Sequence, residues 1–170
     1  LAGRLDELDM MDKDGQARAM AVIDECKDVG DTCGGIAELR VRGLKCGFGS
    51  CMTSAQKLDG RLAGALMAVQ AVKGVEFGAG FAFAALRGSH ANDTFYQDCD
   101  TVKTETNNNG GVNGGITNGM PLVFRVCIKP TPSISSMQQT LNIQTGKVEP
   151  LSIHGRHDPC IVTRAAPVVE

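Results

Sequence analysis

The sequence has few aromatic residues and no tryptophan; aromatic side chains make up 4% of its 170 residues. Proteins that bind single-stranded nucleic acid stack the bases on aromatic rings, so this scarcity argues against that class. The 17 basic and 19 acidic side chains give a formal net charge of −2, so the sequence also lacks the positive field that attracts nucleic acid. We therefore expect no nucleic-acid partner.

Long apolar runs and paired cysteine motifs are missing as well. No apolar stretch reaches the roughly 18 to 20 residues that a bilayer span needs, so we expect no membrane association. The seven cysteines are irregularly spaced, and Cys46 and Cys51 have no second pair to complete a zinc site. We expect no metal, and free thiols in a cytoplasmic protein, several of them packed as small core residues. A structural protein built on thiols or zinc is one alternative.

The sequence is rich in segments with helix and strand periodicity, and its length suits one domain, residues 1–170, with a buried core. Apolar spacing predicts helices over 13–28 and 57–72, ended by Gly30 and Gly74. Strands are predicted over 36–42, 75–84, 121–128 and a shorter stretch near 134–141, and loops over 43–56 and 87–119. This order of elements indicates an α/β or α+β fold.

Both ends of the sequence suggest a piece of a longer protein. It lacks an initiator Met, and it stops at Glu170 inside an apolar, helix-like run. Its charged first residues do not resemble a secretory signal peptide. We expect further chain beyond the residues given.

Three polar loops carry residues suited to an anionic ligand. The first, 106–119, is rich in Asn and Gly, which tolerate left-handed conformations and bring backbone amides close to a ligand. The second, 129–133, places a lysine and two hydroxyls beside prolines that pre-set the backbone. The third, 155–160, combines an arginine, a histidine, a carboxylate and a thiol, a group that is costly to bury unless its members are paired or bind a ligand.

Each loop also has a plainer interpretation. Residues 106–119 can form a flexible linker, and 129–133 an ordinary edge turn. Arg156 and Asp158 can form a surface ion pair worth about 0–1 kcal/mol. The sequence shows no partner for His90 or His154, which are expected to be solvated or structural. The coincidence of three such loops nevertheless favours a site for phosphate or another anion.

A series of short motifs, taken together, points to one family. They are Ala71-Val-Lys-Gly-Val-Glu76, Gly78-Ala-Gly-Phe81, Gly110-Gly111 with Gly114-Gly-Ile-Thr-Asn-Gly-Met-Pro121, Phe124-Arg125, Lys129-Pro-Thr-Pro-Ser-Ile134, Gly155-Arg-His-Asp-Pro-Cys160 and Arg164-Ala-Ala-Pro-Val-Val-Glu170, with Gly30-Asp31 and Gly34-Gly35 also matching. In this order and spacing they resemble the chorismate synthases. The resemblance covers about Asp24–Glu170 and corresponds to the C-terminal half of a member.

The resemblance implies a fold and a reaction. The fold is a β-α-β sandwich, with sheets packed on helices, assembled as a homotetramer. The reaction converts 5-enolpyruvylshikimate 3-phosphate to chorismate and phosphate by 1,4-anti elimination, a step of the shikimate pathway toward the aromatic amino acids. It needs reduced FMN although it has no net redox change, and a proton must leave C6 of the ring.

The resemblance also implies roles for individual residues. Asp158 is similar to the aspartate that works with the flavin in removing the proton, and Arg156 to the arginine at the flavin and the substrate phosphate. The residues similar to the remaining FMN contacts are Gln70, Ala71, Gly114, Lys129, Pro130, Thr131, Pro132 and Ser133. Gln70 stands where many members have Asn, and the family's N-terminal half, which supplies the acid histidines and most substrate arginines, lies outside this sequence. A non-catalytic flavin- or phosphate-binding module is therefore the other alternative.

Overall fold

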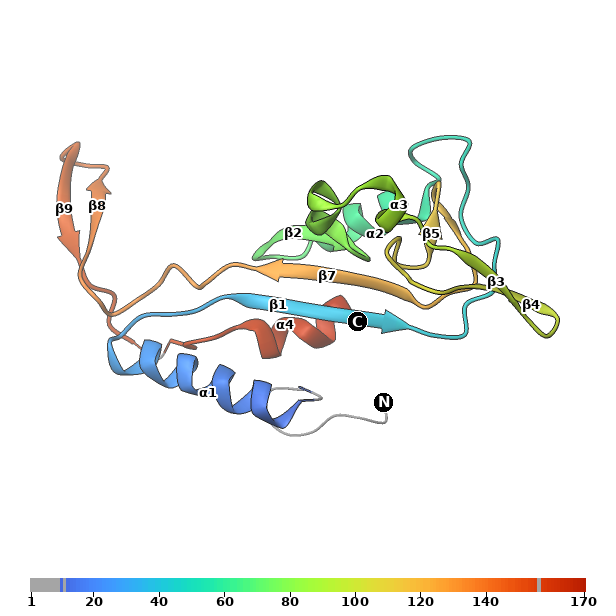
Figure 1. Ribbon diagram of the computed structural model, residues 1–170. Helices are drawn as coiled ribbons and strands as arrows, with labels where there is room; N and C mark the ends of the chain where they lie inside the picture. The colour runs from blue at the N-terminus through green and yellow to red at the C-terminus, as the bar shows by residue number, and fades with distance from the viewer. Residues whose placement is uncertain (1–9, 11, 156) are drawn as a thin grey trace. The chain divides into compact units, whose positions relative to one another are not determined.

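The computed structural model describes residues 10, 12–155 and 157–170 (Figure 1). They form two compact units, one built from the chain up to Gly35 together with Ile128–Val168, and one from Ile36–Cys127 with the last two residues. The helices are α1 (Lys13–Asp28), α2 (Leu58–Met67), the 3-10 helix η1 (Gly80–Ala85), α3 (Gly88–Ala91) and α4 (Val162–Val169). The strands are β1 (Gly35–Val41), β2 (Val72–Phe77), β3 (Phe95–Asp98), β4 (Thr101–Thr104), β5 (Val112–Asn113), β6 (Ile116–Thr117), β7 (Leu122–Ile128), β8 (Gln138–Asn142) and β9 (Lys147–Leu151). The mixed α/β class is thus confirmed, while the single domain stays a prediction.

Helix α1 of the first unit is defined by signals at both of its ends. The Asp12 side chain accepts hydrogen bonds from the amides of Asp14 and Gly15, at 3.1 and 2.9 Å, as an N-cap. At the other end Gly30 adopts φ +70°, and the Asp31 amide donates to the Cys26 carbonyl at 2.8 Å. This is the glycine-dependent ending called a Schellman motif. The predicted helix 13–28 and its stop at Gly30 are confirmed.

A two-stranded hairpin of β8 and β9 also belongs to the first unit. The strands pair antiparallel from Gln138 opposite Leu151 to Asn142 opposite Lys147. The predicted strand near 134–141 therefore starts later than expected, and its partner β9 was not predicted. Pro150 inside β9 weakens the strand signal, and a two-stranded hairpin tolerates it because both strands are edges.

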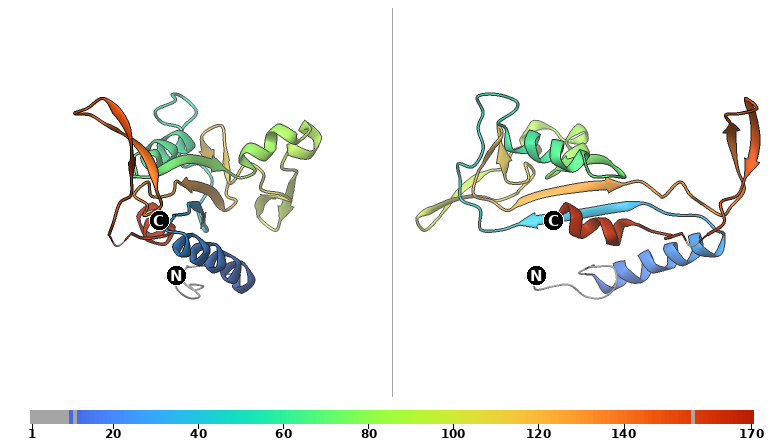
Figure 2. Two further views of the ribbon diagram at one scale, coloured as in Figure 1. Left: turned by 90° about the vertical axis from the view of Figure 1, so that its left-hand side faces the viewer. Right: turned by 180° about the vertical axis from the view of Figure 1, so that it is seen from behind.

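The core of the second unit is centred on β7, the middle strand of a three-stranded sheet with the order β1-β7-β2. Strands β1 and β7 run side by side in opposite directions in Figure 1 and Figure 2. Alternate residues of β7 are buried, with Val126 at 0% and Phe124 at 5% exposure, and the rings of Phe124 and Phe77 lie 5.8 Å apart. Leu66 of α2 is also buried. The predicted strands 121–128 and 36–42 are confirmed.

The region between α2 and η1 differs from the prediction. Helix α2 ends at Met67, five residues before the expected end, and Gly74 lies inside β2 instead of ending a helix. The expected strand 75–84 stops at Phe77 because Gly78 and Gly80 turn the backbone with φ +56° and +53°. The chain then forms the 3-10 helix η1. The prediction of a strand over 75–84 is therefore wrong for residues 78–84, because positive φ at two glycines interrupts the extended backbone.

The polar stretch 87–119, expected to be a loop, contains a short helix and two hairpins. Strands β3 and β4 pair across Cys99 and Asp100, and β5 and β6 pair across Gly114 and Gly115. Their two-residue turns need positive φ, which Cys99 at +51° and Gly114 at +60° supply. Apolar periodicity misses these strands because they have only four and two residues.

The cysteines do not form part of the core. All seven are free; Cys26, Cys33 and Cys160 are half-buried, and Cys46, Cys51, Cys99 and Cys127 are exposed. The expectation that several pack as small core residues is wrong, because β-branched, leucine and phenylalanine side chains fill the core instead. Within the described residues, no helix combines the length and apolar character needed to cross a bilayer.

Candidate functional site

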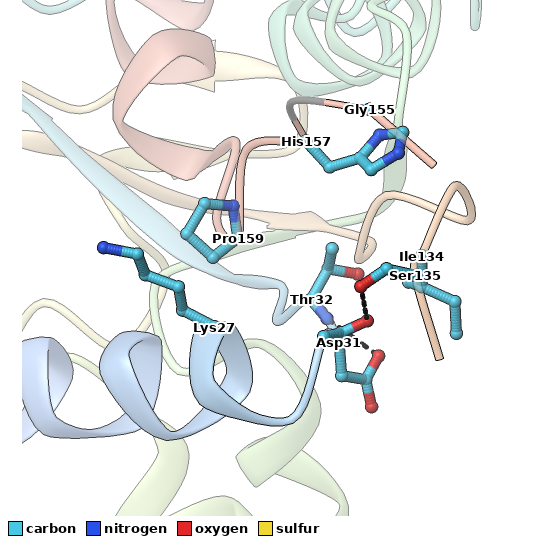
Figure 3. Close-up of a pocket in the computed structure, with 9 residues that line it drawn as sticks. Lys27, Asp31, Thr32, Ile134, Ser135, Gly155, His157 and Pro159 are labelled. Carbon is cyan, nitrogen blue, oxygen red and sulfur yellow. Dashed lines mark hydrogen bonds between the residues drawn. The ribbon is translucent and has the colours of Figure 1, made fainter. Parts of the chain in front are cut away.

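The first unit contains a cavity of about 220 Å³ at the C-terminal end of α1 (Figure 3). Its lining comes from the end of that helix, the turn after it, the segment before β8 and the segment before α4. The lining residues are Lys27, Gly30, Asp31, Thr32, Ile134, Ser135, Gly155, His157 and Pro159. The volume lies below the roughly 300–1,000 Å³ of sites that enclose a drug-sized ligand, so this cavity suits a phosphate or one end of a larger molecule.

Gly30 joins the end of α1 to the segment before β8. Its carbonyl accepts hydrogen bonds from the amides of Ser135 and Ser136, both at 3.0 Å. A side chain at Gly30 would place its Cβ 2.3 Å from the Ser135 hydroxyl oxygen, in addition to the strain of φ +70°. Glycine is therefore required here both for the helix ending and for the close approach of the loop that lines the cavity.

The two residues before Gly34 connect two of the predicted anion loops. The Thr32 hydroxyl, on a residue only 8% exposed, donates to the Thr131 carbonyl at 2.6 Å. The next amide, of Cys33, donates to the Pro159 carbonyl at 2.8 Å. Because one hydrogen bond reaches the 129–133 loop and the other the 155–160 loop, the structure brings these two predicted loops together around the same short segment.

The 129–133 loop has features expected of an anion-binding corner. Lys129, Pro130 and Pro132 are exposed, and Thr131 and Ser133 are half-buried. The Thr131 hydroxyl oxygen is itself buried and, among the described residues, has no hydrogen-bond partner. A buried hydroxyl without a partner costs free energy, which a bound phosphate group would recover after a small local adjustment. The corner therefore fits the phosphate end of a flavin.

In the 155–160 loop, His157 and Asp158 point to different surroundings. His157 lines the cavity, with Nε2 3.2 Å from the Ile153 carbonyl; since a carbonyl only accepts, Nε2 is the donor in this contact. The carboxylate of Asp158 instead forms an ion pair with Arg164 at 2.7 Å. The prediction for Arg156 lies outside the described residues.

Three thiols gather beside the loop. Cys33 and Cys160 pair as neighbours across an isolated β-bridge. Burial, together with the nearby thiols of Cys160 and Cys26, raises the pKa of Cys33 to about 12. A thiol with such a pKa stays protonated at neutral pH and is a poor nucleophile. Within the described residues no group of three or more His, Cys, Asp or Glu side chains is arranged to hold a metal ion.

The predicted flavin contacts Gln70, Ala71 and Gly114 belong to the second unit. Ala71, between α2 and β2, has φ +68°, a conformation that costs a non-glycine residue roughly 1–2 kcal/mol. Gly114, at φ +60°, has open space where a side chain would stand, and its neighbour Gly115 accepts a hydrogen bond from the Leu58 amide at 2.9 Å. Stored backbone strain of this kind is common at ligand sites, so Ala71 supports the predicted role of this turn.

The Asn-rich loop 106–119 is held by a residue that the sequence argument did not select. Asp93 accepts hydrogen bonds from the Thr106 hydroxyl at 2.7 Å and the amides of Asn108 and Asn109 at 2.7 and 2.9 Å. The Asn109 side chain donates a fourth, at 2.7 Å. Burial alone would raise the pKa of Asp93, but these bonds outweigh it and lower the pKa below its ordinary value. A flexible linker would not be anchored in this way.

The same loop borders a second cavity, of about 330 Å³, within the second unit. Two arginines near the end of β1 face an Asn, a Met and a Pro from the loop and its flanks. The lining residues are Arg40, Arg42, Gly78, Asn107, Met120, Pro121 and Val123. Arginine forks suit carboxylates and phosphates. Arg40 already pairs with Glu38 at 2.6 Å, so Arg42 is the arginine of this lining that would meet an anion.

Sequence reasoning missed Asp31, Thr32 and Asp93 as site residues. For Asp31 and Thr32 a signal was present, because Gly30-Asp31 and Gly34-Gly35 match the family motifs. For Asp93 the only signal was Asn92-Asp93-Thr94, which reads as a chance glycosylation motif. Its bonding partners lie 13 to 16 residues away in the sequence, so no local pattern could reveal them.

Comparison with known proteins identifies the family of the chain. The family model described as chorismate synthase matches residues 3–170. A chorismate synthase of Dehalococcoides mccartyi is 49% identical over 153 residues, 90% of this chain and 42% of the relative. One of Methanococcus maripaludis is 45% identical over 146 residues, 86% of this chain and 39% of the relative.

A solved structure supports the same assignment. The crystal structure of a chorismate synthase matches 73% of this chain and 37% of its own, with a TM-score of 0.66 and 40% identity. The predicted β-α-β fold of that type is thereby confirmed. The chain spans about 40% of the length of the relatives it matches. With a family match over nearly its whole length, the chain belongs to the chorismate synthase family.

Proposed function

We propose that the protein carrying this chain converts 5-enolpyruvylshikimate 3-phosphate to chorismate and phosphate, as a reduced-FMN-dependent lyase of the shikimate pathway. The observation that carries the proposal is the convergence of the 129–133 and 155–160 loops on Thr32 and Cys33. Both loops carry family motifs, and each is hydrogen-bonded to this short segment, which supports their joint role in binding an anion. Family membership over residues 3–170 supports the reaction type.

In this reaction the chain's own residues bind an anion and accept a proton. The Asp158 carboxylate takes the proton that leaves C6 of the ring. Phosphate leaves from C3, and the electron pair of the broken C6–H bond ends in the new diene. The Pro159 carbonyl, bonded to the Cys33 amide, holds the backbone on which Asp158 stands.

FMN would be held by residues of the predicted loops. Lys129 and the Thr131 and Ser133 hydroxyls, stiffened by Pro130 and Pro132, would bind its phosphate, and Arg156 would contact both flavin and substrate. The remaining part of FMN would contact the turn at Gln70 and Ala71 and the hairpin tip at Gly114. When bound, reduced FMN supplies the electron-rich ring that assists departure of the allylic phosphate without net redox change.

The setting of the enzyme is also part of the proposal. The resemblance to this family implies a homotetramer, and we propose the same assembly for this protein. We also propose that it works in the cytoplasm. The half-buried and exposed free cysteines fit a reducing compartment. The proposed partners are the substrate and other copies of the protein.

Replacing Asp158 by Asn tests the proposed role of its carboxylate. The substitution keeps the shape of the side chain and removes its ability to accept the proton. We expect turnover of the whole protein to fall by roughly 10²–10⁴-fold, measured as chorismate formed with reduced FMN. The FMN dissociation constant, from fluorescence titration, should change by less than about threefold, since other residues hold the flavin.

The matched control is Asp24→Asn, which changes an exposed aspartate of α1 in the same unit. This variant should leave both the turnover and the FMN dissociation constant unchanged. Full turnover in Asp158→Asn would refute the role of Asp158. Equal loss of FMN binding and turnover would make Asp158 a binding residue instead of the proton acceptor.

A further inference from the structure

Arg164 forms an ion pair with the residue proposed to take the proton. Its Nη1 lies 2.7 Å from Oδ2 of Asp158, whose side chain is 33% exposed. Both residues belong to the first unit. Among the described residues no hydrogen bond reaches the other carboxylate oxygen, Oδ1. One oxygen is therefore held and the other is left to accept a proton.

The two residues are held by rigid backbone on either side. Arg164 stands in the first turn of α4, where its amide donates to the Ile161 carbonyl at 3.1 Å and the next amide donates to the same carbonyl at 3.0 Å. Asp158 precedes Pro159, whose ring fixes φ and whose carbonyl is bonded to the Cys33 amide at 2.8 Å. With the backbone held on either side, the side-chain torsions of Asp158 and Arg164 are the freedom that remains, and the ion pair restrains both.

We propose that Arg164 is a positioning residue, which holds the Asp158 carboxylate in the orientation that presents Oδ1 to the departing proton. This rests on the proposed function, in which Asp158 accepts that proton. General-base catalysis needs the acceptor within hydrogen-bond reach of the proton. A carboxylate that rotates freely spends only part of its time there, so removal of Arg164 lowers the rate of proton removal and leaves ligand binding intact.

Another arginine of the same unit provides a matched control. Arg18 pairs with Asp12 at 3.6 Å, and its side chain is 74% exposed, against 72% for Arg164. The two arginines are therefore almost equally exposed, and they differ mainly in the aspartate with which each one pairs. Surface pairs of this kind contribute about 0–1 kcal/mol to stability, so neither substitution is expected to unfold the protein.

The experiment compares Arg164→Met, Arg164→Lys and Arg18→Met in the whole protein. For Arg164→Met we expect kcat to fall by roughly 10- to 100-fold, with KM, the FMN dissociation constant and the urea midpoint all near the wild-type values. The isotope effect with substrate deuterated at C6 should rise, because proton removal becomes more rate-limiting. Arg164→Lys keeps the charge and should recover most of kcat, and Arg18→Met should match the wild type.

A second set of variants separates the positioning role from the proposed function. In an Asp158→Asn background, Arg164→Met should cause no further loss, because residues that act as a unit are not additive. An inactive Asp158→Asn with a fully active Arg164→Met would overturn the positioning role alone. An active Asp158→Asn would overturn both. A fall in FMN affinity and urea midpoint in step with kcat would show Arg164 to be structural and would also overturn the inference.

Discussion

Asp93 illustrates how a single carboxylate can organise a loop that the sequence marks as polar. Its two oxygens receive four hydrogen bonds from residues 106, 108 and 109. Hydrogen bonds that favour the ionised form more than offset the cost of burying it. The Asn108 carbonyl in turn accepts the Ala79 amide at 2.7 Å, so the ordering of the loop extends to the turn after β2.

Protonation or substitution of Asp93 should therefore loosen the loop. Because its folded pKa is lower than the ordinary 3.8, its contribution is fully present above about pH 4 and is lost as pH falls through the folded value. Asp93→Asn should lower the free energy of unfolding by about 1–3 kcal/mol at pH 7. Its stability should also vary less with pH between about 2 and 4 than that of the wild type. Urea denaturation across this range measures both effects.

The comparison for Asp93 is Asp100→Asn, an exposed aspartate in the turn between β3 and β4 of the same unit. This variant should keep the wild-type pH dependence. An Asp93→Asn variant as stable as the wild type at pH 7, and equally sensitive to acid, would mean that the four hydrogen bonds contribute nothing net to the loop.

The chemical types of the site residues could be predicted from the sequence, but their pairing could not. The sequence predicts a role for 129–133 from its lysine, hydroxyls and prolines, and for 155–160 from its arginine, histidine, carboxylate and thiol. That Asp158 pairs with Arg164, and that Thr32 and Cys33 each bond to one of the loops, depends on tertiary contacts. Thr32 and Thr131 are 99 positions apart, and a contact at that separation leaves no periodic trace in the sequence.

At the scale of elements, the strand β1 begins where the chain passes very close to the 129–133 loop. A side chain at Gly34 would place its Cβ 2.4 Å from the Ile128 carbonyl oxygen and 3.0 Å from Cδ of Pro130. The Ile128 carbonyl cannot make room for this Cβ unless the end of the strand moves. The glycine therefore sets how closely the loop approaches the segment that lines the cavity.

Gly34→Ala is thus expected to displace the loop. The variant should lower the free energy of unfolding by about 1–3 kcal/mol, as overpacked sites do, and should weaken FMN binding several-fold. The control is Gly64→Ala in α2, where a Cβ meets open space, and where Ala should stabilise the helix by up to about 1 kcal/mol. If Gly34→Ala bound FMN as tightly as Gly64→Ala, the loop would not hold the flavin phosphate.

Helices and strands were predictable where one spacing of apolar residues continued over two helical turns or a full strand. Helix α1 and strand β7 combine a long regular pattern with a clear cap or a fully buried face. The strand expected at 75–84 failed because apolar residues continue past Gly78 and Gly80, where the backbone turns. The hairpins β3–β4 and β5–β6 were missed because their strands have only four and two residues.

At the scale of the whole molecule, the two units leave many large apolar side chains exposed. Phe81 at 85%, Met52 at 81% and Ile143 at 90% exposure are examples. Side chains of this kind are candidates for contacts with other parts of the whole protein. Since the chain spans about 40% of its relatives' length, turnover and flavin binding are best measured on the whole protein.

The most direct test of the central claim is chorismate formation by the whole protein from 5-enolpyruvylshikimate 3-phosphate, under anaerobic conditions, with and without reduced FMN. The account predicts stoichiometric release of phosphate and chorismate only when reduced FMN is present, with FMN bound more tightly in the presence of substrate. Saturable FMN binding by the folded protein without any chorismate would contradict the account and would identify a non-catalytic flavin-binding module instead.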